Sequence, residues 1–502
     1  MKYYALVIIA IMILLTACEV KEPMLPKWDV DLRIPLINQQ FFASDLVDNV
    51  NIITDDDQVL TLTSNGSAET PEFGPVPFNP NSQMDNVPIP GTGANLFIPF
   101  IDNEGIVEIS YAEVSSGLMR SRFTNVNSSV QELKLVFHNL FQANGEEFEI
   151  IWAGGADWVN TSMAGLHIGT LDSGQIVSEL PVSLVVTPAQ PQGTTAALFS
   201  FQANSAMNFP RFQGHLNEYL LEMTSSLASV DISYPYDINE AVEMQEASLR
   251  VVLTNYIGFT AKFSGRIRAE NEAGDVRYVD IVDDNGNLYN TTAAVGNTPG
   301  ITVLDFHNNI SQLLQIMPTQ LKMVDGLLTI NSGQGIGSVE IEDKVIADYT
   351  INAPMILILN DHEIVIRDEQ EITIPEDNRN QIRDNALSAS INILIKNTLP
   401  VGAAVELYFG DSPNIDVDNP DTYDFLKTAH IHSVATEAGW QPLDITLSKP
   451  ELDVFAQPSV YLRWAFTFES SNGQPVTIYA RTTDYIHVKG MMLANILIEE
   501  TD

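Results

Sequence analysis

The chain has 502 residues, 45% of them hydrophobic, and carries 65 acidic against 24 basic residues for a formal net charge of −41. This apolar content is enough to bury several cores and excludes a chain that is disordered as a whole. The negative charge repels phosphate backbones and anionic head groups, which excludes nucleic acid as a partner and a basic patch as the means of holding a membrane.

The N-terminus has the pattern of an export signal. Lys2 precedes an uncharged apolar run, Ala5 to Leu15, which has the length of a signal-peptide core and is too short to span a bilayer comfortably. The run leads into Leu15-Thr16-Ala17-Cys18, which resembles the lipobox of bacterial lipoproteins. The resemblance implies that the thiol of Cys18 is diacylglycerylated, that residues 1–17 are removed, and that the new amine is acylated, usually with palmitate-type chains.

Cys18 is the only cysteine in the chain, so no disulfide can form within it. The alternative to lipidation is an ordinary secretory signal, or an uncleaved anchor, with an incidental cysteine. Glu19 follows the cysteine, and Lys21-Glu22 resembles the acidic export signal of surface lipoproteins in Bacteroidota-like organisms. We therefore expect a cell-envelope protein, lipid-anchored in the outer membrane on its periplasmic or extracellular face.

Residues 18–27 contain two prolines and several charges, and we expect a short tether there. The next segment, 28–34, alternates apolar and polar residues, which is typical of a half-buried strand. Residues 64–95 are rich in Pro, Gly, Asn and Ser, and this composition predicts a long irregular insertion.

Most of the remaining sequence predicts strands separated by turns. Two segments predict helices instead, because their apolar residues fall on one helical face. These are 214–228, with Leu216, Leu220, Met223 and Leu227, and about 305–317, with Phe306, Ile310, Leu313, Leu314 and Met317.

A weak internal repeat appears when three segments are aligned on Asn125, Asn255 and Asn397. Apolar residues recur two positions before each asparagine, and eight and twelve positions after it: Phe123, Leu253 and Ile395; Leu133, Phe263 and Val405; Phe137, Ile267 and Phe409. Each copy therefore predicts a strand, an asparagine-led turn and a second strand, although any two β-hairpins look alike at this level.

The repeat predicts an all-β, mainly antiparallel fold with several β-sandwich-like domains in tandem and a few short helices. The expected units are the signal peptide at 1–17, the tether at 18–27, and β-rich domains at 28–235, 236–384 and 385–502. The asparagine-turn segments loosely resemble immunoglobulin-like modules, without the Cys…Trp…Cys core of that family.

The segment from Gly410 to Phe425 places five aspartates in one loop: Asp411, Asp416, Asp418, Asp421 and Asp424. Closely spaced carboxylate oxygens are the ligands that calcium prefers. The loop lacks the glycine and the terminal glutamate of an EF-hand, so a solvated acidic loop is the alternative to a calcium site.

Trp152 and Trp158 flank the glycine turn of "IIWAGGADWVN". Two aromatic rings held on a flexible turn could stack on sugar rings as ligand-binding residues. Packing of the two rings in a hydrophobic core is the competing interpretation.

The sequence contains no G-x-S-x-G nucleophile motif and no zinc-peptidase motif, and a lone cysteine bound to lipid cannot act as a nucleophile. We therefore expect no catalytic residues and a non-enzymatic protein with a structural, adhesive or ligand-binding role towards a protein or glycan partner at the cell surface. The alternative is a surface glycan-binding or glycan-degrading protein, because an acid pair among 65 carboxylates cannot be recognised by spacing.

Overall fold

The computed structural model describes residues 27–203, 205–225, 228–229, 238–283, 285–307, 309–330, 335–365 and 369–499. Cys18, the signal peptide and most of the tether lie outside this part of the chain. Within it the strands pair antiparallel, and the helices are short: η1 (Ala43–Leu46), α2 (Ile238–Ala241), α3 (Ser311–Leu314), α4 (Glu376–Asn385), η2 (Pro420–Thr422) and α5 (Lys449–Val454). The predicted fold class is confirmed. No helix among these residues has the length and apolarity to cross a membrane.

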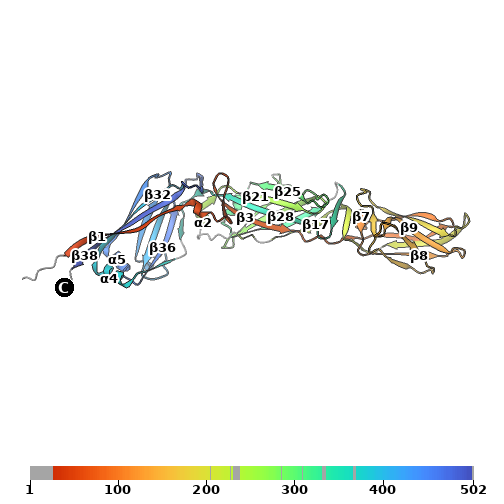
Figure 1. The fold of residues 1–502 in the computed structure, drawn as a ribbon, viewed down its shortest axis with the longest axis horizontal. Coiled ribbons are helices and arrows are strands. Elements are labelled where there is room, and N and C mark those ends of the chain that lie inside the picture. Colours follow the sequence, from red (N-terminus) through yellow and green to blue (C-terminus); the bar gives the residue numbers. More distant parts are fainter. Residues whose placement is uncertain are drawn as a thin grey trace, which may run out of the picture.

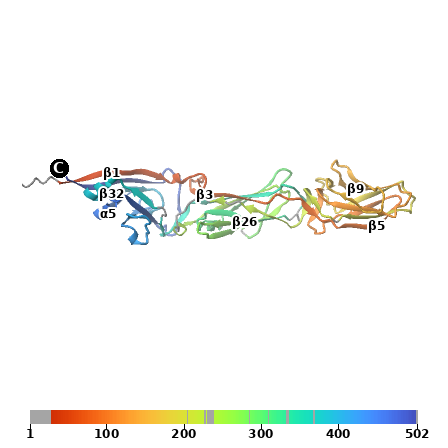
Figure 2. The same ribbon diagram turned by 90° about the horizontal axis from the view of Figure 1, so that it is seen from below.

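Three β-modules lie end to end along an elongated molecule (Figure 1, Figure 2). The proximal module contains both the first described strand, β1 (Lys27–Phe42), and the last, β38 (Tyr485–Glu499). Both ends of the described chain therefore lie at the same end of the molecule, and the distal module lies at the other (Figure 1).

The distal module contains two facing sheets. The first has the order β11-β8-β14-β5: β5 (Ser82–Pro90), β8 (Leu118–Thr124), β11 (Val159–Ser162) and β14 (Thr195–Ala203). The second is built on β6 (Ala94–Pro99), β9 (Glu132–Phe141), β10 (Glu147–Ile151) and β13 (Glu179–Thr187), and continues through β12 (His167–Gly169), β7 (Val107–Glu113) and β16 (Arg211–Leu216). Two short strands, β4 (Val76–Phe78) and β15 (Met207–Phe209), pair beside them.

The middle module repeats this arrangement. Its first sheet has the order β25-β21-β28-β3: β3 (Leu60–Glu69), β21 (Ser248–Asn255), β25 (Gly300–Phe306) and β28 (Val345–Pro354), with β2 (Ile52–Thr54) and β18 (Thr224–Ser225) at its border. Its second sheet has the order β23-β22-β26-β17: β17 (Tyr219–Glu222), β22 (Ala261–Glu270), β23 (Val276–Asp280) and β26 (Gln320–Ile330), extended by β19 (Ala228–Ser229) and β24 (Tyr289–Asn290).

The proximal module is a third copy. Its first sheet has the order β35-β32-β38-β1, with β32 (Ala386–Asn397) and β35 (Trp440–Leu447). Its second sheet has the order β34-β33-β36-β30: β30 (Glu363–Val365), β33 (Ala403–Gly410), β34 (Phe425–Ile431) and β36 (Ser459–Phe468), with β31 (Gln370–Thr373) also on β36.

The three modules therefore share one strand plan. In each module the first of six strands lies in the first sheet and the next two, which pair with each other, lie in the second sheet. The fourth strand returns to the first sheet, the fifth joins the second sheet, and the sixth joins the first. The six strands that follow this path are β8-β9-β10-β11-β13-β14, β21-β22-β23-β25-β26-β28 and β32-β33-β34-β35-β36-β38. The predicted internal repeat corresponds to the first step of this plan, from the first sheet to the second.

The modules are nested rather than consecutive. In each first sheet, the partner of the last of these six strands comes from the chain before the six strands begin: β1 pairs with β38, β3 with β28, and β5 with β14. The strands of the middle and distal modules lie between β1 and the other strands of the proximal module, and the distal strands lie between β3 and the later strands of the middle module. The division into domains at 28–235, 236–384 and 385–502 does not follow these sheets, because β1 and β3 pair with strands in the third and second of those segments. Sequence adjacency cannot reveal pairing partners hundreds of residues apart.

In each module a short segment, which we call the crossing, connects the first strand of the plan, in the first sheet, to the second strand, in the second sheet. Two of the three asparagines of the repeat are buried at the start of this crossing. Asn255 is 1% exposed. Its Nδ2 donates to the carbonyl oxygens of Phe259 and Thr292, both at 2.9 Å, and its Oδ1 accepts from the backbone N–H of Ile257 at 2.9 Å. The amide thus clamps the crossing to the loop that precedes β25.

Asn397 makes the same set of hydrogen bonds in the proximal module, where it is fully buried. Its Nδ2 donates to the carbonyl oxygens of Val401 at 2.7 Å and His432 at 3.0 Å, and its Oδ1 accepts from the N–H of Leu399 at 2.9 Å. His432 lies in the loop that precedes β35, so the two clamps are equivalent. Each buried amide satisfies backbone groups that lie away from solvent.

Three local predictions are wrong. Residues 64–95 contain part of β3, all of β4 and β5, and the start of β6. The prolines of β5 are compatible with a strand because β5 is the edge of its sheet, where a missing N–H is tolerated.

The segment 214–228 forms strands rather than a helix in its described part, which omits 226–227. Glu218 adopts a left-handed φ of 52° and separates β16 from β17. Leu220 is exposed and Leu221 buried, which is the alternation of a strand. In 305–317 the α-helix is limited to α3 (Ser311–Leu314), because Phe306 ends β25.

The modules are joined by strands and by apolar packing. β27 (Gly337–Glu340) of the middle module extends the second distal sheet by pairing with β16, and the rings of Phe212 and Phe259 stack across this joint with centroids 6.4 Å apart. At the other joint β20 (Val242–Met244), β29 (Ile356–Leu359) and β37 (Val476–Thr477) form a small sheet. These contacts hold the distal module at the end of the elongated molecule.

Candidate functional site

The two tryptophans of the glycine turn have different surroundings. Trp152 follows β10 and packs against the distal core, where its ring meets that of Phe123 edge-on at 6.1 Å. Its Nε1 donates to the carbonyl oxygen of Gly155 at 3.1 Å, which closes the turn. Gly154 and Gly155 have φ angles of 98° and 93°, which side chains disfavour, so the glycines allow the chain to reverse here. Trp152 is therefore a half-buried residue that packs against the distal core.

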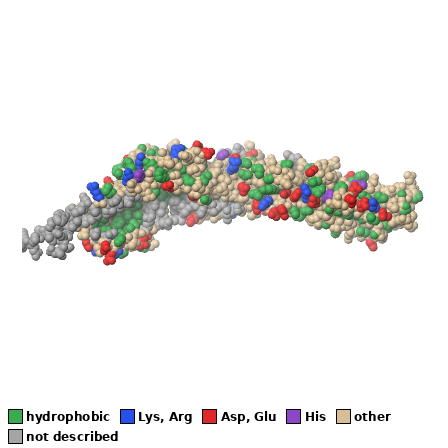
Figure 3. Space-filling model, viewed as in Figure 1, with side chains coloured by type: hydrophobic (Ala, Val, Ile, Leu, Met, Phe, Trp, Pro, Cys, Tyr) green, Lys and Arg blue, Asp and Glu red, His purple; other side chains and the backbone are tan. Residues whose placement is uncertain are grey.

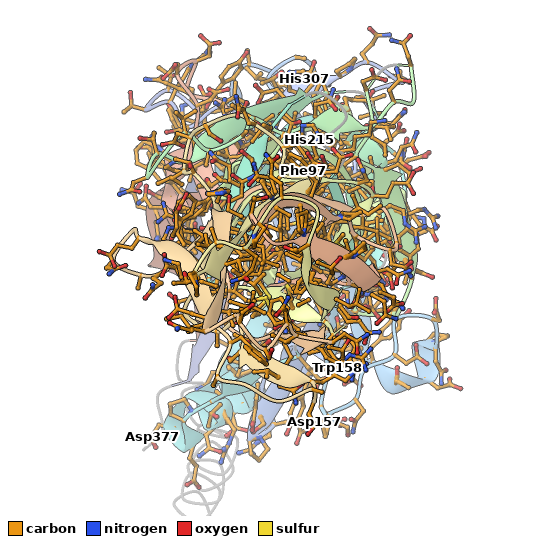
Figure 4. All side chains as sticks on the ribbon, turned by 90° about the vertical axis from the view of Figure 1, so that its right-hand side faces the viewer. Phe97, Asp157, Trp158, His215, His307 and Asp377 are labelled. Atoms are coloured by element: carbon orange, nitrogen blue, oxygen red, sulfur yellow. The ribbon has the colours of Figure 1, made fainter. Side chains whose placement is uncertain are left out.

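Trp158 lies on the outer face of the first distal sheet, directly before β11. Two arginines of β8 lie against its ring, which is partly exposed: the Cζ of Arg120 lies 4.8 Å, and that of Arg122 4.7 Å, from the ring centroid. The two arginines alternate along one strand and so point to the same face. Figure 4, which looks onto the distal end, shows Trp158 beside Asp157 and apart from Phe97.

Amide side chains continue this face across the sheet. Asn160 pairs with Arg120, Arg120 with Gln202, and Gln202 with Gln83, so these four residues form a row over β11, β8, β14 and β5. The Nε of Arg120 donates to Oε1 of Gln202 at 2.7 Å, and its Nη2 donates to the same oxygen. We call Trp158, Arg120, Arg122 and this amide row the distal face.

The arginines of the distal face have no carboxylate partner among the described residues. Neither Arg120 nor Arg122 forms an ion pair with any residue that the structure describes, and the Nε of Arg122 is buried without a hydrogen bond. Other arginines are paired, for example Arg266 with Asp325 and Arg268 with Glu270. Figure 3 shows carboxylates spread along the visible surface. Other arginines without a described ion pair, such as Arg277 and Arg463, donate to backbone carbonyl oxygens, whereas Arg120 and Arg122 lie together against one ring.

The aspartate loop of the proximal module does not gather its carboxylates. Asp424 accepts from the N–H of Asp411 at 2.9 Å, and Asp416 accepts from the N–H of Asp418 at 3.2 Å. Asp421 donates its N–H to the side chain of Asn419. Among all described residues, no group of three or more His, Cys, Asp or Glu side chains is arranged to hold a metal ion. The carboxylates cap the turns around η2, and the expected calcium site has no converging ligand set.

An open groove of about 690 Å³ in the middle module has no counterpart in the sequence predictions. It is bounded by the end of β23, the loop after it, the end of β25 and α3, with Tyr278, Asp280, Asp283, Tyr289, Asp305 and His307 among its lining residues. Asp283 is committed to its own turn: hydrogen bonds from Asn287 and Asn285 lower its pKa. The groove forms where the end of β25 lies beside this turn.

Comparison with known proteins gives structural resemblances only. No protein-family model matches the chain. No curated protein matches it in sequence. A solved structure from Parabacteroides distasonis, described as a candidate secreted protein, is 11% identical with a TM-score of 0.32, over 57% of this chain and 88% of that one. Structures of the infectious bursal disease virus Gx and Gt strains are 10% and 8% identical with TM-scores of 0.15, over 88% and 95% of this chain and 83% of each of those. These values support no inference about function.

Proposed function

We propose that this chain is a lipid-anchored, non-enzymatic protein of the cell envelope that holds its distal module away from the membrane as an adhesive or ligand-binding end. The observation that supports the proposal is the nesting of the modules, which leaves the start of β1 at the end of the molecule opposite the distal module. Nine residue steps separate Cys18 from Lys27, a reach of at most about 30 Å. A lipid on Cys18 would therefore keep the proximal module near the bilayer.

Replacing Cys18 tests the anchor. The wild-type protein, expressed with its signal in a bacterium that has an outer membrane, should incorporate labelled palmitate and separate into the detergent phase of Triton X-114. Cys18→Ser should incorporate no label and remain in the aqueous phase. Because this thiol is the only one in the chain, labelled palmitate on the variant would contradict the proposal directly. Density-gradient separation of the two membranes then tests the outer-membrane location.

A second candidate function is glycan binding at the distal face, as the alternative to a purely structural role. The outward position of Trp158 favours it, because a ring on a flat sheet face can stack on a sugar ring, whereas Trp152 is committed to the core. Calorimetric titration of the chain from residue 19 onwards with a panel of neutral and acidic polysaccharides tests it. Saturable binding that Trp158→Ala abolishes supports glycan binding; no heat with any member of the panel leaves the structural role.

A further inference from the structure

The charge of the distal face is opposite to that of the chain as a whole. The protein has 65 acidic residues for 24 basic ones, yet Arg120 and Arg122 lie two positions apart on β8 with no described carboxylate against either. In the same module Arg211 is paired with Glu113 and Glu340, and Lys134 with Glu149. The two unpaired guanidinium groups therefore form a local positive site.

Trp158 fixes the position of both guanidinium groups. A ring with Cζ atoms at 4.7 and 4.8 Å holds each cation by its quadrupole and removes water from one side of it. Gln202 occupies Nε and Nη2 of Arg120, and the Nε of Arg122 is buried. The Nη1 of Arg120 and both Nη atoms of Arg122 form no hydrogen bond with a described residue. These donors are held in place and suit a planar carboxylate.

The remainder of the distal face suits hydroxyl groups. Asn160 and Gln202 lie on either side of Arg120, and Gln83 follows Gln202. The Oε1 of Gln202 already accepts from Arg120 and the Nε2 of Gln83 donates to Asp85, so the amide of Asn160, the Nε2 of Gln202 and the Oε1 of Gln83 remain to supply donors and acceptors. The face is a sheet surface rather than a closed pocket, so it fits an extended chain. A net charge of −41 repels densely charged polymers, and so favours a ligand with sparse carboxylates over a polyphosphate.

We infer that the distal face binds an acidic carbohydrate, in which Arg120 and Arg122 receive the carboxylate of a uronic acid, Trp158 stacks on a sugar ring, and the amide row receives hydroxyl groups. This inference rests on glycan binding as the proposed function and names its ligand class. An acidic peptide would use the arginines alone, because it offers no sugar ring to Trp158 and no hydroxyl pattern to the amides.

Calorimetry with paired probes tests the inference. The chain from residue 19 onwards is titrated with oligogalacturonate, oligomannuronate and unsulfated chondroitin, each beside its methyl ester, which keeps the ring and removes the charge. We expect binding to at least one free acid, at least tenfold weaker binding to its ester, and weaker binding as salt is raised. Equal affinity for acid and ester contradicts the inference but leaves glycan binding intact, whereas no binding of any probe contradicts both.

Variants assign the contacts. Arg120→Gln and Arg122→Gln should each weaken binding of the free acid roughly tenfold and leave the ester unchanged. Lys134→Gln, which removes the same charge from the second sheet of the same module, should have no effect. Trp158→Ala should weaken acid and ester alike. Binding of poly-glutamate that depends on the arginines but not on Trp158 would identify an acidic peptide instead and overturn the inference.

Discussion

The distal and proximal modules have the same strand plan but differ in how the loop between the third and fourth strands of the plan is held. In the proximal module the loop between β34 and β35 is tied to the crossing by the buried Asn397. In the distal module the corresponding loop, between β10 and β11, carries Trp152 and Trp158. The crossing asparagine there, Asn125, is exposed with a left-handed φ of 51°, and forms no hydrogen bond through its side chain with a described residue.

The distal crossing is also longer. It spans residues 125–131, compared with 256–260 and 398–402 in the other modules. Asn127 supplies part of the missing clamp, because its Oδ1 accepts from the N–H of Ser129 at 3.1 Å, but it does not reach the loop that carries the tryptophans. The distal sandwich therefore forms without the asparagine clamp. Where the clamp is absent, the loop is available to place Trp158 beside Arg120 and Arg122.

The largest effect is expected from removing the clamp. Asn255→Ala removes the donor to two carbonyls and the acceptor of one N–H in a buried corner, and Asn397→Ala does the same except that the His432 carbonyl keeps its hydrogen bond from Gln441 Nε2. Each change should lower the free energy of unfolding of the affected module by about 2–4 kcal/mol. Asn125→Ala should cost at most about 1 kcal/mol, mainly from its left-handed φ. Hydrogen–deuterium exchange of the strands on either side of each crossing measures the difference by module. Equal losses at Asn125 and Asn397 would show that the crossings are energetically alike.

A smaller effect should separate the two tryptophans. Trp152→Ala removes a ring from the distal core and should destabilise that module by about 2–3 kcal/mol. Trp158→Ala removes a ring from the outer face and should cost less than about 1 kcal/mol. Thermal unfolding of the two variants checks the stability, and the glycan titration checks the binding. The opposite order of stability losses would mean that Trp158 is part of the distal core.

The smallest effect concerns pH. Burial opposes ionisation of Glu451, but hydrogen bonds from Lys427 and from Ser448 at the start of α5 outweigh it and lower the pKa of this carboxyl. A lowered pKa contributes stability above the unfolded value near pH 4.5, and this contribution is lost as the pH falls through the folded value. Glu451→Gln should therefore lower the stability of the proximal module by about 1 kcal/mol at pH 7.

At pH 3 the unfolding curves of Glu451→Gln and the wild type should coincide. The distal pair of Lys134 and Glu149 is a matched control, because it is more exposed and its Glu149→Gln variant should change little at either pH. A constant difference between Glu451→Gln and wild type from pH 7 to pH 3 would show that the effect of this residue is not electrostatic.

The alternation of apolar and polar residues predicted the strands, and the asparagine repeat predicted where the chain passes from one strand to the next at each crossing. Phe123, Leu253 and Ile395 are buried as their places in the repeat predict, because each sits just before the crossing on the inner face. The same pattern could not show that the second strand joins a different sheet, since a hairpin and a crossing have equal periodicity. The helix expected at 214–228 failed because Leu216 and Leu220 fit both a helical face and even strand positions, and the left-handed Glu218 decides between them.

The candidate site was predicted only in part. Trp152 and Trp158 were both expected to bind ligand or to lie in the core, and the glycine turn between them hid that one faces inward and the other outward. Arg120-Ser121-Arg122 carried a signal that could have been used, because alternate residues of a strand share a face. Whether two such arginines are free to bind a ligand depends on which carboxylates lie near them, and only the folded structure determines this.

The pairing of β1 with β38 has a consequence for the order of events during synthesis. Lys27 lies opposite Glu499, so the first strand to be made acquires its partner last. At typical rates of translation the delay is on the order of a minute. The innermost module is completed first and the outermost last, and throughout this time both edges of β1 are unpaired, which is a hazard for aggregation. The arrival of β38 closes the outermost module and leaves β1 as its edge strand.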